Sequence, residues 1–413
     1  VAAAGDMKRR FAALFGEEHA GALAFRTING ICQSIISYYA WAKGAEPFAL
    51  WTNEGELNAL VRWLMQSHGA EWPGEQEVKE VRTRITCCKN GMLRDEEVRA
   101  IEMDGVDFPA VYFGYREYLE RNRRMDYDDQ MVFALRILRR YPDILAHFQS
   151  KYPYLCVDEA QDTSKIQHAI LRLLAARSRN LFMVGDVKQS IYRFRLADPT
   201  IFLGKYRAFA DYTQAAEGEE RRILSRNFRS RPEVLEGANF VFRSVMSADF
   251  GEMDYTADEA LYPGAPFPPD GRYAVELDAV DASAEGEEEK TARDLIEARF
   301  AAKRIRTLVD GGFPVSDGEG GGRPVRPADI VILLRSPNTV LHHYARALGE
   351  RDIPWEAEGG GDFFAATEVN VALSLLQIVD NPRQDVPLIS VLRSPVYGFS
   401  ADRLAELRAA SPD

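Results

Sequence analysis

Cysteine is scarce in this sequence. The four cysteines, at positions 32, 87, 88 and 156, form no CxxC pair and no Cys/His group with metal-ligand spacing. This argues against a structural zinc site and against a small domain held together by disulfides. Free thiols are the expected state, which favours a reducing cytoplasm as the location. We expect Cys156 to be buried in a core strand.

Long apolar runs and positive charge are also lacking. No segment approaches membrane-spanning length, and the first residues do not resemble a secretion signal, so we expect no membrane partner. Acidic residues outnumber basic ones by 63 to 51, and the net charge of −12 works against a broad nucleic-acid-binding surface. Any contact with nucleic acid must therefore come from local basic and aromatic groups within a channel.

The composition is that of a globular protein with several domains. Its 413 residues predict two or three domains, and 46% hydrophobic with 28% charged residues is typical of a soluble protein. The sequence begins at Val1 without a methionine, inside an amphipathic helical pattern over residues 2–15, and ends on the polar segment 411–413 after another helical pattern. We therefore expect an internal piece of a longer protein.

Two apolar runs end in polar clusters. Residues 154–157 lead into Asp-Glu-Ala-Gln-Asp at 158–162, and residues 181–184 lead into Gly-Asp-Val-Lys-Gln at 185–189. Apolar residues recur at helical spacing over 166–174 between them. Strand, helix and strand of this length predict a βαβ crossover in a parallel sheet. Because ligands of such sheets bind at the carboxyl ends of the strands, we expect both clusters to lie there.

An acid pair that leaves a buried strand suits nucleotide chemistry. Asp158 is placed to coordinate Mg²⁺ and Glu159 to activate water, as in an ATP-hydrolysing motor. Gln189 follows the second run, and a third predicted strand, residues 222–224, leads to a Phe-Arg pair at 228–229. Each group alone has an ordinary alternative: an acidic turn, a loop glutamine or a surface arginine. Their placement after three strands of one predicted sheet favours a triphosphate site.

Other segments predict mainly helices. The expected helices cover 27–39, 125–141, 234–245, 339–348 and 368–379, with a buried strand at 330–334 and a loop or loose hairpin over 311–327. Residues 41–124 are helix-prone, rich in tryptophan and charge, and have no strong strand signal. This texture predicts a helical insertion, for which a subdomain without chemistry is a sufficient explanation.

The motifs resemble those of the UvrD/Rep-type superfamily-one DNA helicases. The matching segments are 157–162 (Walker B), 184–195 (the third motif), 227–230 (the fourth), 125–129 (a signature upstream of Walker B), 3–7 (the tail of motif Ia) and 27–30 (the position of motif Ib). Later segments are most similar to the AddA subfamily, the helicase-nuclease subunits of bacterial recombination complexes; these are 188–195, 251–255, 362–364, 368–369, 381–385 and 392–395. Residues 27–32 depart from the AddA pattern toward plain UvrD-like helicases.

The resemblance implies an α/β fold of RecA-like P-loop NTPase motor domains, with parallel sheets flanked by helices. The first motor domain would span residues 1–220, with a helical inserted subdomain at about 42–124. The second would span 221–383, and a truncated further insertion would begin at 384–413. Because no GxxxxGK[ST] occurs in the sequence, the resemblance implies that motif I precedes Val1 and that further motifs follow Asp413. We expect the 413-residue chain alone to be inactive.

The resemblance also implies roles for individual residues at an ATP site. Asp158 would hold Mg²⁺, and Glu159 would be the general base for the attacking water. Gln189 would sense the γ-phosphate and couple it to DNA. Arg229 would stabilise charge on the transferred phosphoryl group, and Phe228 would stack on the adenine.

A second group of residues is implied at a DNA site. Tyr192 and Phe194 would stack on bases of single-stranded DNA, a contact that tolerates any sequence because every base has a π-face. Thr27, Asn29 and Arg195 are further candidates for strand contacts or for coupling. The alternative for the two aromatic residues is packing in the core.

The function implied is an ATP-dependent DNA helicase and translocase of double-strand-break repair and recombination, as a fragment of an AddA-like subunit. ATP and Mg²⁺ would be its cofactors. Its partners would be single-stranded and duplex DNA and an AddB-like subunit. One alternative is a free-standing UvrD-like repair helicase. Another is a non-catalytic DNA-binding subunit with the helicase fold, against which Asp158, Glu159, Gln189 and Arg229 all argue.

Overall fold

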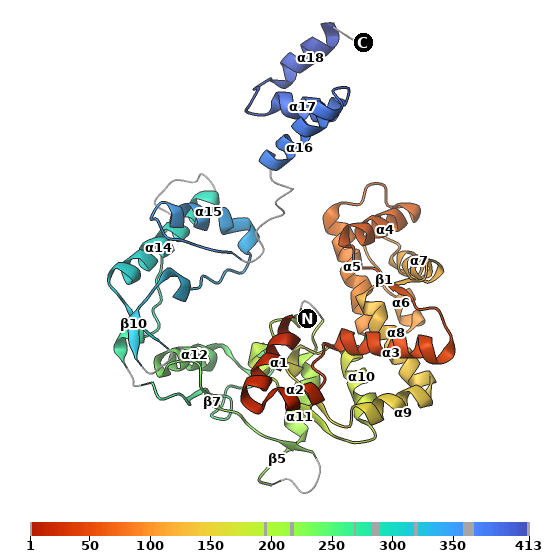
Figure 1. Cartoon of the computed structure of the whole chain (residues 1–413), viewed down its shortest axis with the longest axis vertical. Helices are drawn as coiled ribbons and strands as arrows, with labels where there is room; N and C mark the ends of the chain where they lie inside the picture. The colour runs from red at the N-terminus through yellow and green to blue at the C-terminus, as the bar shows by residue number, and fades with distance from the viewer. Residues whose placement is uncertain are drawn as a thin grey trace. The chain divides into compact units, whose positions relative to one another are not determined.

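The computed structural model describes residues 2–193, 196–214, 219–267, 270–281, 290–317, 321–357 and 367–410. The chain forms two compact units, Val1–Ala274 and Val275–Asp413. The described residues are mostly helical, and their strands are short and joined in pairs (Figure 1). No helix in this part of the chain is both long and apolar enough to cross a membrane.

The first unit opens with three helices, α1 (Ala2–Phe15), α2 (Glu17–Ala22) and α3 (Ile28–Lys43). Helix α3 begins at a capping interaction in which the Thr27 hydroxyl accepts a hydrogen bond from the Gly30 N–H, 3.1 Å away. It packs against α8 (Tyr127–Arg140), and the two share the main hydrophobic core with α9 (Pro142–Lys151) and α10 (Lys165–Ala175). The helices predicted at residues 2–15, 27–39 and 125–141 are confirmed.

The segment predicted to be a helical insertion has its own core. Its helices are α4 (Glu54–Ser67), α5 (Glu75–Asn90), α6 (Asp95–Arg99) and α7 (Phe108–Arg121) (Figure 1). They enclose a cluster of buried side chains that includes Leu57, Val81 and Phe108. The two ends of the segment meet in a parallel pair of two-residue strands, β1 (Ala49–Leu50) and β2 (Arg124–Met125), in which Ala49 lies opposite Arg124.

The predicted strand–helix–strand unit is confirmed. Strand β3 (Leu155–Val157) pairs in parallel with β4 (Leu181–Met183), with Leu155 opposite Leu181, and α10 joins them. The prediction that Cys156 is buried is wrong, because only one face of this two-stranded sheet is covered. Leu155 and Val157 point to the covered face, whereas Cys156 and its partner Phe182 are both exposed.

The third predicted strand is displaced. Residues 222–224 lie between two short strands, β6 (Glu220–Arg221) and β7 (Arg226–Asn227), rather than in one. Strand β6 pairs with β5 (Ala210–Asp211) and β7 with β8 (Tyr262–Pro263), so in the described part of the chain neither belongs to the β3–β4 sheet. The predicted single sheet is therefore wrong here.

Buried Asn239 explains why β8 lies beside β7. This residue lies on α12 (Pro232–Val245), the helix predicted over residues 234–245. Its side-chain amide donates to the Leu261 carbonyl at 2.9 Å and accepts from the Leu261 N–H at 2.9 Å. These two bonds fix the chain directly before β8. Helix α11 (Pro199–Ala208) precedes the β5–β6 pair, and α13 (Ala248–Gly251) follows α12.

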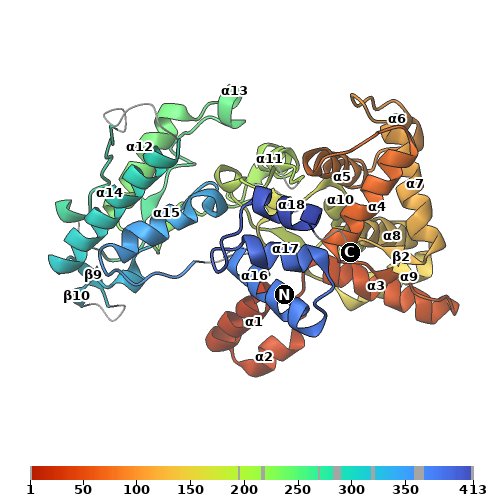
Figure 2. The ribbon, with the colours of Figure 1, turned by 90° about the horizontal axis from the view of Figure 1, so that it is seen from above.

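In the second unit, α14 (Lys290–Asp310) and α15 (Pro337–Gly349) lie side by side (Figure 2). The hairpin expected within 311–327 is confirmed as antiparallel β9 (Pro314–Ser316) and β10 (Gly322–Pro324). Residues 330–334 do not form the predicted buried strand, because their odd side chains are exposed and only the even ones pack against the α14–α15 core. Helices α16 (Thr367–Asp380), α17 (Asp385–Arg393) and α18 (Ala401–Ala410) complete the unit.

Candidate functional site

The acid pair lies on a strained turn directly after β3. Asp158 and Glu159 are both exposed, and Glu159 has a φ of 51°, in the left-handed region that non-glycine residues rarely adopt. The Asp158 carboxylate accepts a hydrogen bond from the Glu159 N–H at 3.1 Å. A residue in this backbone region persists only where surrounding contacts stabilise it, and such residues are frequent at functional sites.

The second polar cluster lies beside the acid pair, as predicted. The Val184 N–H donates to the Val157 carbonyl, and the Ala160 N–H donates to the Val184 carbonyl, both at 2.8 Å. The loop that follows is ordered around Asp186, whose carboxylate accepts a hydrogen bond from the Gln189 side-chain amide at 3.0 Å. The ends of β3 and β4 therefore hold carboxylates and an exposed amide in adjacent loops.

Phe228 and Arg229 occupy a separate turn after β7. The Asn227 side chain accepts hydrogen bonds from the N–H groups of Arg229 and Ser230 at 2.9 and 2.8 Å, which fixes the turn. Phe228 is 70% exposed, and its ring lies so close to Gly264 that a Cβ there would approach a ring carbon to 2.8 Å. Among the described residues, no hydrogen bond or ion pair joins Arg229 to Asp158, Glu159 or Gln189.

The candidate DNA-stacking loop is described in part. Tyr192 is 38% exposed, which does not fit the alternative of a residue buried in the core. Phe194 and Arg195 lie outside the described residues. Arg193 forms an ion pair with Glu252, and the Glu252 carbonyl accepts a hydrogen bond from Arg207 at 2.7 Å, so the start of this loop is anchored to the chain after α13.

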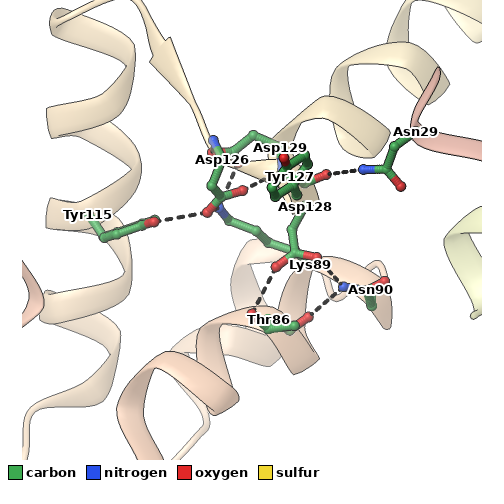
Figure 3. Close-up of polar contacts among 9 residues, drawn as sticks. All are labelled: Asn29, Thr86, Lys89, Asn90, Tyr115, Asp126, Tyr127, Asp128 and Asp129. Atoms are coloured by element: carbon green, nitrogen blue, oxygen red, sulfur yellow. Dashed lines mark hydrogen bonds and ion pairs between the residues drawn. The ribbon is translucent and has the colours of Figure 1, made fainter. Parts of the chain in front are cut away.

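Thr27 and Asn29 both have partners within the protein. The Thr27 hydroxyl caps α3, and the Asn29 amide donates to the Gln130 side chain at 3.2 Å. The same amide donates to the Tyr127 carbonyl at 3.3 Å (Figure 3). Tyr127, by contrast, is 52% exposed. Tyr127 was not singled out in the sequence analysis, although this residue lies within the 125–129 signature. The signal that could have identified it is an aromatic residue between acidic residues at the start of a helix.

A buried charge cluster lies at the start of α8. Lys89, whose side chain is 4% exposed, contacts the carboxylates of Asp126 and Asp129 at 2.6 and 2.8 Å (Figure 3). The Tyr115 hydroxyl donates to Asp126 at 2.9 Å. Burial opposes the charge on Lys89, but the two carboxylates outweigh it and raise the pKa of Lys89. The cluster joins α5 and α7 of the insertion to the start of α8, and sequence reasoning missed it.

Asp128 extends the cluster on the side of α5. Its carboxylate accepts hydrogen bonds from the Thr86 hydroxyl and the Asn90 amide, both at 2.8 Å (Figure 3). Burial, and after it the Asp126 carboxylate, raises the pKa of Asp128 above its ordinary value. Three carboxylates at the start of α8, those of Asp126, Asp128 and Asp129, thus lie close to one another, and Lys89 forms ion pairs with two of them.

Comparison with known protein families settles which family these motifs represent. The family model for the UvrD/REP helicase N-terminal domain matches residues 1–210, more than half of the 413-residue chain. The chain belongs to the UvrD/REP helicase family. The UvrD-like helicase C-terminal domain model matches residues 223–411.

The relatives of this chain include much longer proteins. The chain is 38% identical over 356 residues to the AddA-type subunit of the ATP-dependent helicase/nuclease of Bacillus cereus strain B4264 and, to the same extent, to that of Bacillus anthracis. Each alignment covers 81% of this chain and 28% of the relative. The chain therefore spans little more than a quarter of the length of the curated relatives it matches.

The candidate site residues are divided between the two domain matches. Asp158, Glu159 and Gln189 fall within the N-terminal domain, whereas Phe228 and Arg229 fall within the C-terminal domain. The turn that carries Arg229 and the β3–β4 edge are therefore matched by different domain models, although both lie in the compact unit Val1–Ala274. UvrD-like helicase domains have a RecA-like α/β fold, with which the small parallel sheets of this chain agree.

Proposed function

We propose that this chain is the motor portion of an ATP-dependent DNA helicase and translocase, within an AddA-like helicase/nuclease subunit that acts in double-strand-break repair and recombination. The observation that carries the proposal is the adjacency of the acid pair and the Gln189 loop at the carboxyl ends of β3 and β4. Ligands of parallel sheets bind at this edge. The Bacillus relatives, which are named as ATP-dependent helicase/nuclease subunits, support it.

At this edge each exposed side chain has a distinct task. Asp158 would hold Mg²⁺, which would supply positive charge to offset the charge of the phosphate groups. No group of three or more His, Cys, Asp and Glu side chains in the described residues is placed to hold a metal ion. A single carboxylate suits Mg²⁺, because this ion is commonly held by one or two carboxylates together with substrate phosphates. Glu159 would accept the proton of the attacking water, and Gln189 would contact the γ-phosphate.

Arg229 and Phe228 would act from the second motor domain. We propose domain limits of 1–220, with the insertion at about 42–124, then 221–383 and 384–413. The separate core of the insertion supports its treatment as a unit. A guanidinium supplied from the neighbouring domain stabilises transition-state charge only when the two domains close on the nucleotide. Hydrolysis would thereby be tied to domain movement.

The strand of DNA would contact Tyr192, Phe194 and Arg195, of which Tyr192 lies within the described residues. Exposed Tyr127, whose carbonyl accepts a hydrogen bond from Asn29, is a further proposed stacking residue, because stacking on aromatic rings holds bases of any sequence. Asn29 and Thr27 would act mainly by fixing the start of α3, since both side chains are already hydrogen bonded. Further proposed partners are duplex DNA and an AddB-like subunit.

Strand separation by the natural-length protein tests this proposal. We expect a labelled duplex with a single-stranded tail to be unwound when ATP and Mg²⁺ are present and to remain paired when a non-hydrolysable analogue replaces ATP. DNA binding without any ATP hydrolysis would favour the non-catalytic alternative. Unwinding without a nuclease activity in the same polypeptide would favour the free-standing UvrD-like helicase.

A further inference from the structure

A buried glutamine lies between the two polar clusters. Gln161 follows the acid pair by two residues and is 1% exposed. Its side-chain N–H donates to the Glu159 carboxylate at 2.8 Å, and its side-chain oxygen accepts from the Asp186 backbone N–H at 3.0 Å. One amide therefore connects the carboxylate after β3 with the loop after β4.

Gly185, in the loop after β4, lies directly against the side chain of Gln161. A Cβ added to Gly185 would lie 2.6 Å from the side-chain oxygen of Gln161 and 3.1 Å from its backbone nitrogen. The first distance is too short for any side chain, so the loop after β4 approaches Gln161 this closely only because residue 185 is glycine. The contact therefore depends both on the Gln161 amide and on the absence of a side chain at residue 185.

Glu159 has few other constraints. Its side chain is exposed on a turn with left-handed backbone geometry, and among the described residues Gln161 is the only side chain that hydrogen-bonds its carboxylate. An exposed glutamate samples several rotamers, and a general base acts only when its oxygen lies within hydrogen-bond reach of the water it deprotonates. The bond from Gln161 selects one carboxylate position.

We propose that Gln161 is a positioning residue for ATP hydrolysis, which holds the Glu159 carboxylate and ties its position to the loop that carries Gln189 and Tyr192. The inference rests on the proposed function. Asp186 supplies the connection, because its N–H binds Gln161 while its carboxylate binds the Gln189 amide. A shift of the Gln189–Tyr192 segment on DNA binding therefore reaches Glu159 through a single amide side chain.

Two substitutions in the natural-length protein distinguish the two hydrogen bonds of Gln161, one to Glu159 and one from Asp186. Gln161→Leu removes both hydrogen bonds at similar volume. Gln161→Glu keeps an acceptor for the Asp186 N–H but places a second carboxylate against Glu159. We expect each to lower the DNA-stimulated kcat for ATP about 10- to 100-fold, as loss of outer-shell partners typically does. The Kd of a non-hydrolysable ATP analogue with Mg²⁺ should stay within about threefold of the parent, because phosphate-binding groups are untouched.

Gln149→Leu is the matched control. The Gln149 amide also makes a hydrogen bond between segments, to the Leu173 carbonyl at 2.8 Å, but it joins α9 to α10 away from the site. We expect this variant to keep the parental kcat. Gly185→Ala, which displaces Gln161 from the other strand, should reproduce the kcat loss of Gln161→Leu, and the double variant should lose little more than either single one.

Several outcomes overturn the inference. An unchanged kcat in Gln161→Glu would mean that the bond to Glu159 has no role, and a loss of nucleotide affinity parallel to that of kcat would mean that Gln161 only supports the fold. Melting temperatures of all variants identify misfolding. If Glu159→Gln remains active, the proposed function fails as well; if Glu159→Gln is inactive while Gln161→Leu is fully active, only the role of Gln161 is lost.

Discussion

The ammonium group of Lys89 lies 2.6 Å from the carboxylate of Asp126, although the two residues are 37 positions apart. Lys89 lies in the last turn of α5, the second helix of the insertion, and Asp126 caps α8, where its side chain also accepts a hydrogen bond from the Asp129 N–H at 2.7 Å. The pair therefore fixes the insertion to the helix start that carries Tyr127. Taking two charges out of water is costly, so the pair favours one arrangement more than it adds stability.

Removal of the Lys89 charge should destabilise the first unit strongly. Lys89→Met leaves the Asp126 and Asp129 carboxylates buried without a cation, and loss of one partner of a buried pair typically costs about 3–5 kcal/mol of the free energy of unfolding. Urea denaturation of the purified parent chain and variant measures this difference in the free energy of unfolding. The control is Lys43→Met, which breaks the exposed 2.8 Å pair with Asp143 and should cost less than about 1 kcal/mol. Equal losses in both variants would contradict the buried role of Lys89.

Asp128→Asn should stabilise the protein increasingly as the pH rises. Burial and the Asp126 carboxylate raise the pKa of Asp128 above its ordinary value of 3.8. Between that value and the raised pKa, the unfolded chain has released this proton while the folded chain still holds it. The free energy of unfolding therefore falls as the pH rises through this window. An asparagine retains hydrogen-bonding partners in Thr86 and Asn90 without the charge. We expect the melting temperature of the variant to exceed that of the parent more at pH 7 than at pH 4. A difference independent of pH would refute this.

Loss of either proposed catalytic charge should reduce turnover in the natural-length protein. Glu159→Gln removes the base and Arg229→Ala removes a transition-state cation, and each should lower DNA-stimulated ATPase activity by at least about a hundredfold. Steady-state assays with saturating single-stranded DNA measure the loss, while nucleotide titration shows that Glu159→Gln still binds ATP. A near-normal rate would remove the role assigned to that residue.

The 413-residue chain alone should hydrolyse no ATP. Phosphate binding in this fold depends on a Gly-rich loop whose N–H groups and lysine hold the β- and γ-phosphates, and the sequence contains no GxxxxGK[ST]. The assay compares the chain with its own Glu159→Gln variant in the presence of DNA. Turnover above that background would show that another segment replaces the loop.

Tyr127→Ala should weaken binding of single-stranded DNA by the natural-length protein by about 1–3 kcal/mol, the range for loss of one base–aromatic stack. Fluorescence anisotropy with a labelled oligonucleotide measures the change. Tyr154→Ala is the control, because Tyr154 is also exposed but directly precedes β3, at the opposite end of the strand from the acid pair. Similar losses in both variants would argue against a specific strand path across Tyr127.

The sequence predicts the parts of the site that depend on neighbouring residues. The β3–α10–β4 unit and its two polar clusters follow from periodicity and from turn chemistry within about 35 residues. The Lys89 cluster could not be predicted this way, because its partners come from three helices and a lysine within a charged helix ordinarily faces solvent. Apolar composition also led to wrong predictions of burial at Cys156 and at residues 330–334. An apolar run does not reveal whether both of its faces are covered by the rest of the protein.

The β1–β2 ladder has an architectural consequence. Ala49 and Arg124 are direct partners in it, and adjacent strands lie about 4.8 Å apart, so the chain leaves for the helical insertion and returns at almost the same point. The motor helices α3 and α8 would therefore tolerate a much shorter or longer excursion there, since closing a longer loop adds little entropy cost. Interchange of this module between helicases would retain the motor, provided that the incoming module supplies a cation for Asp126 and Asp129.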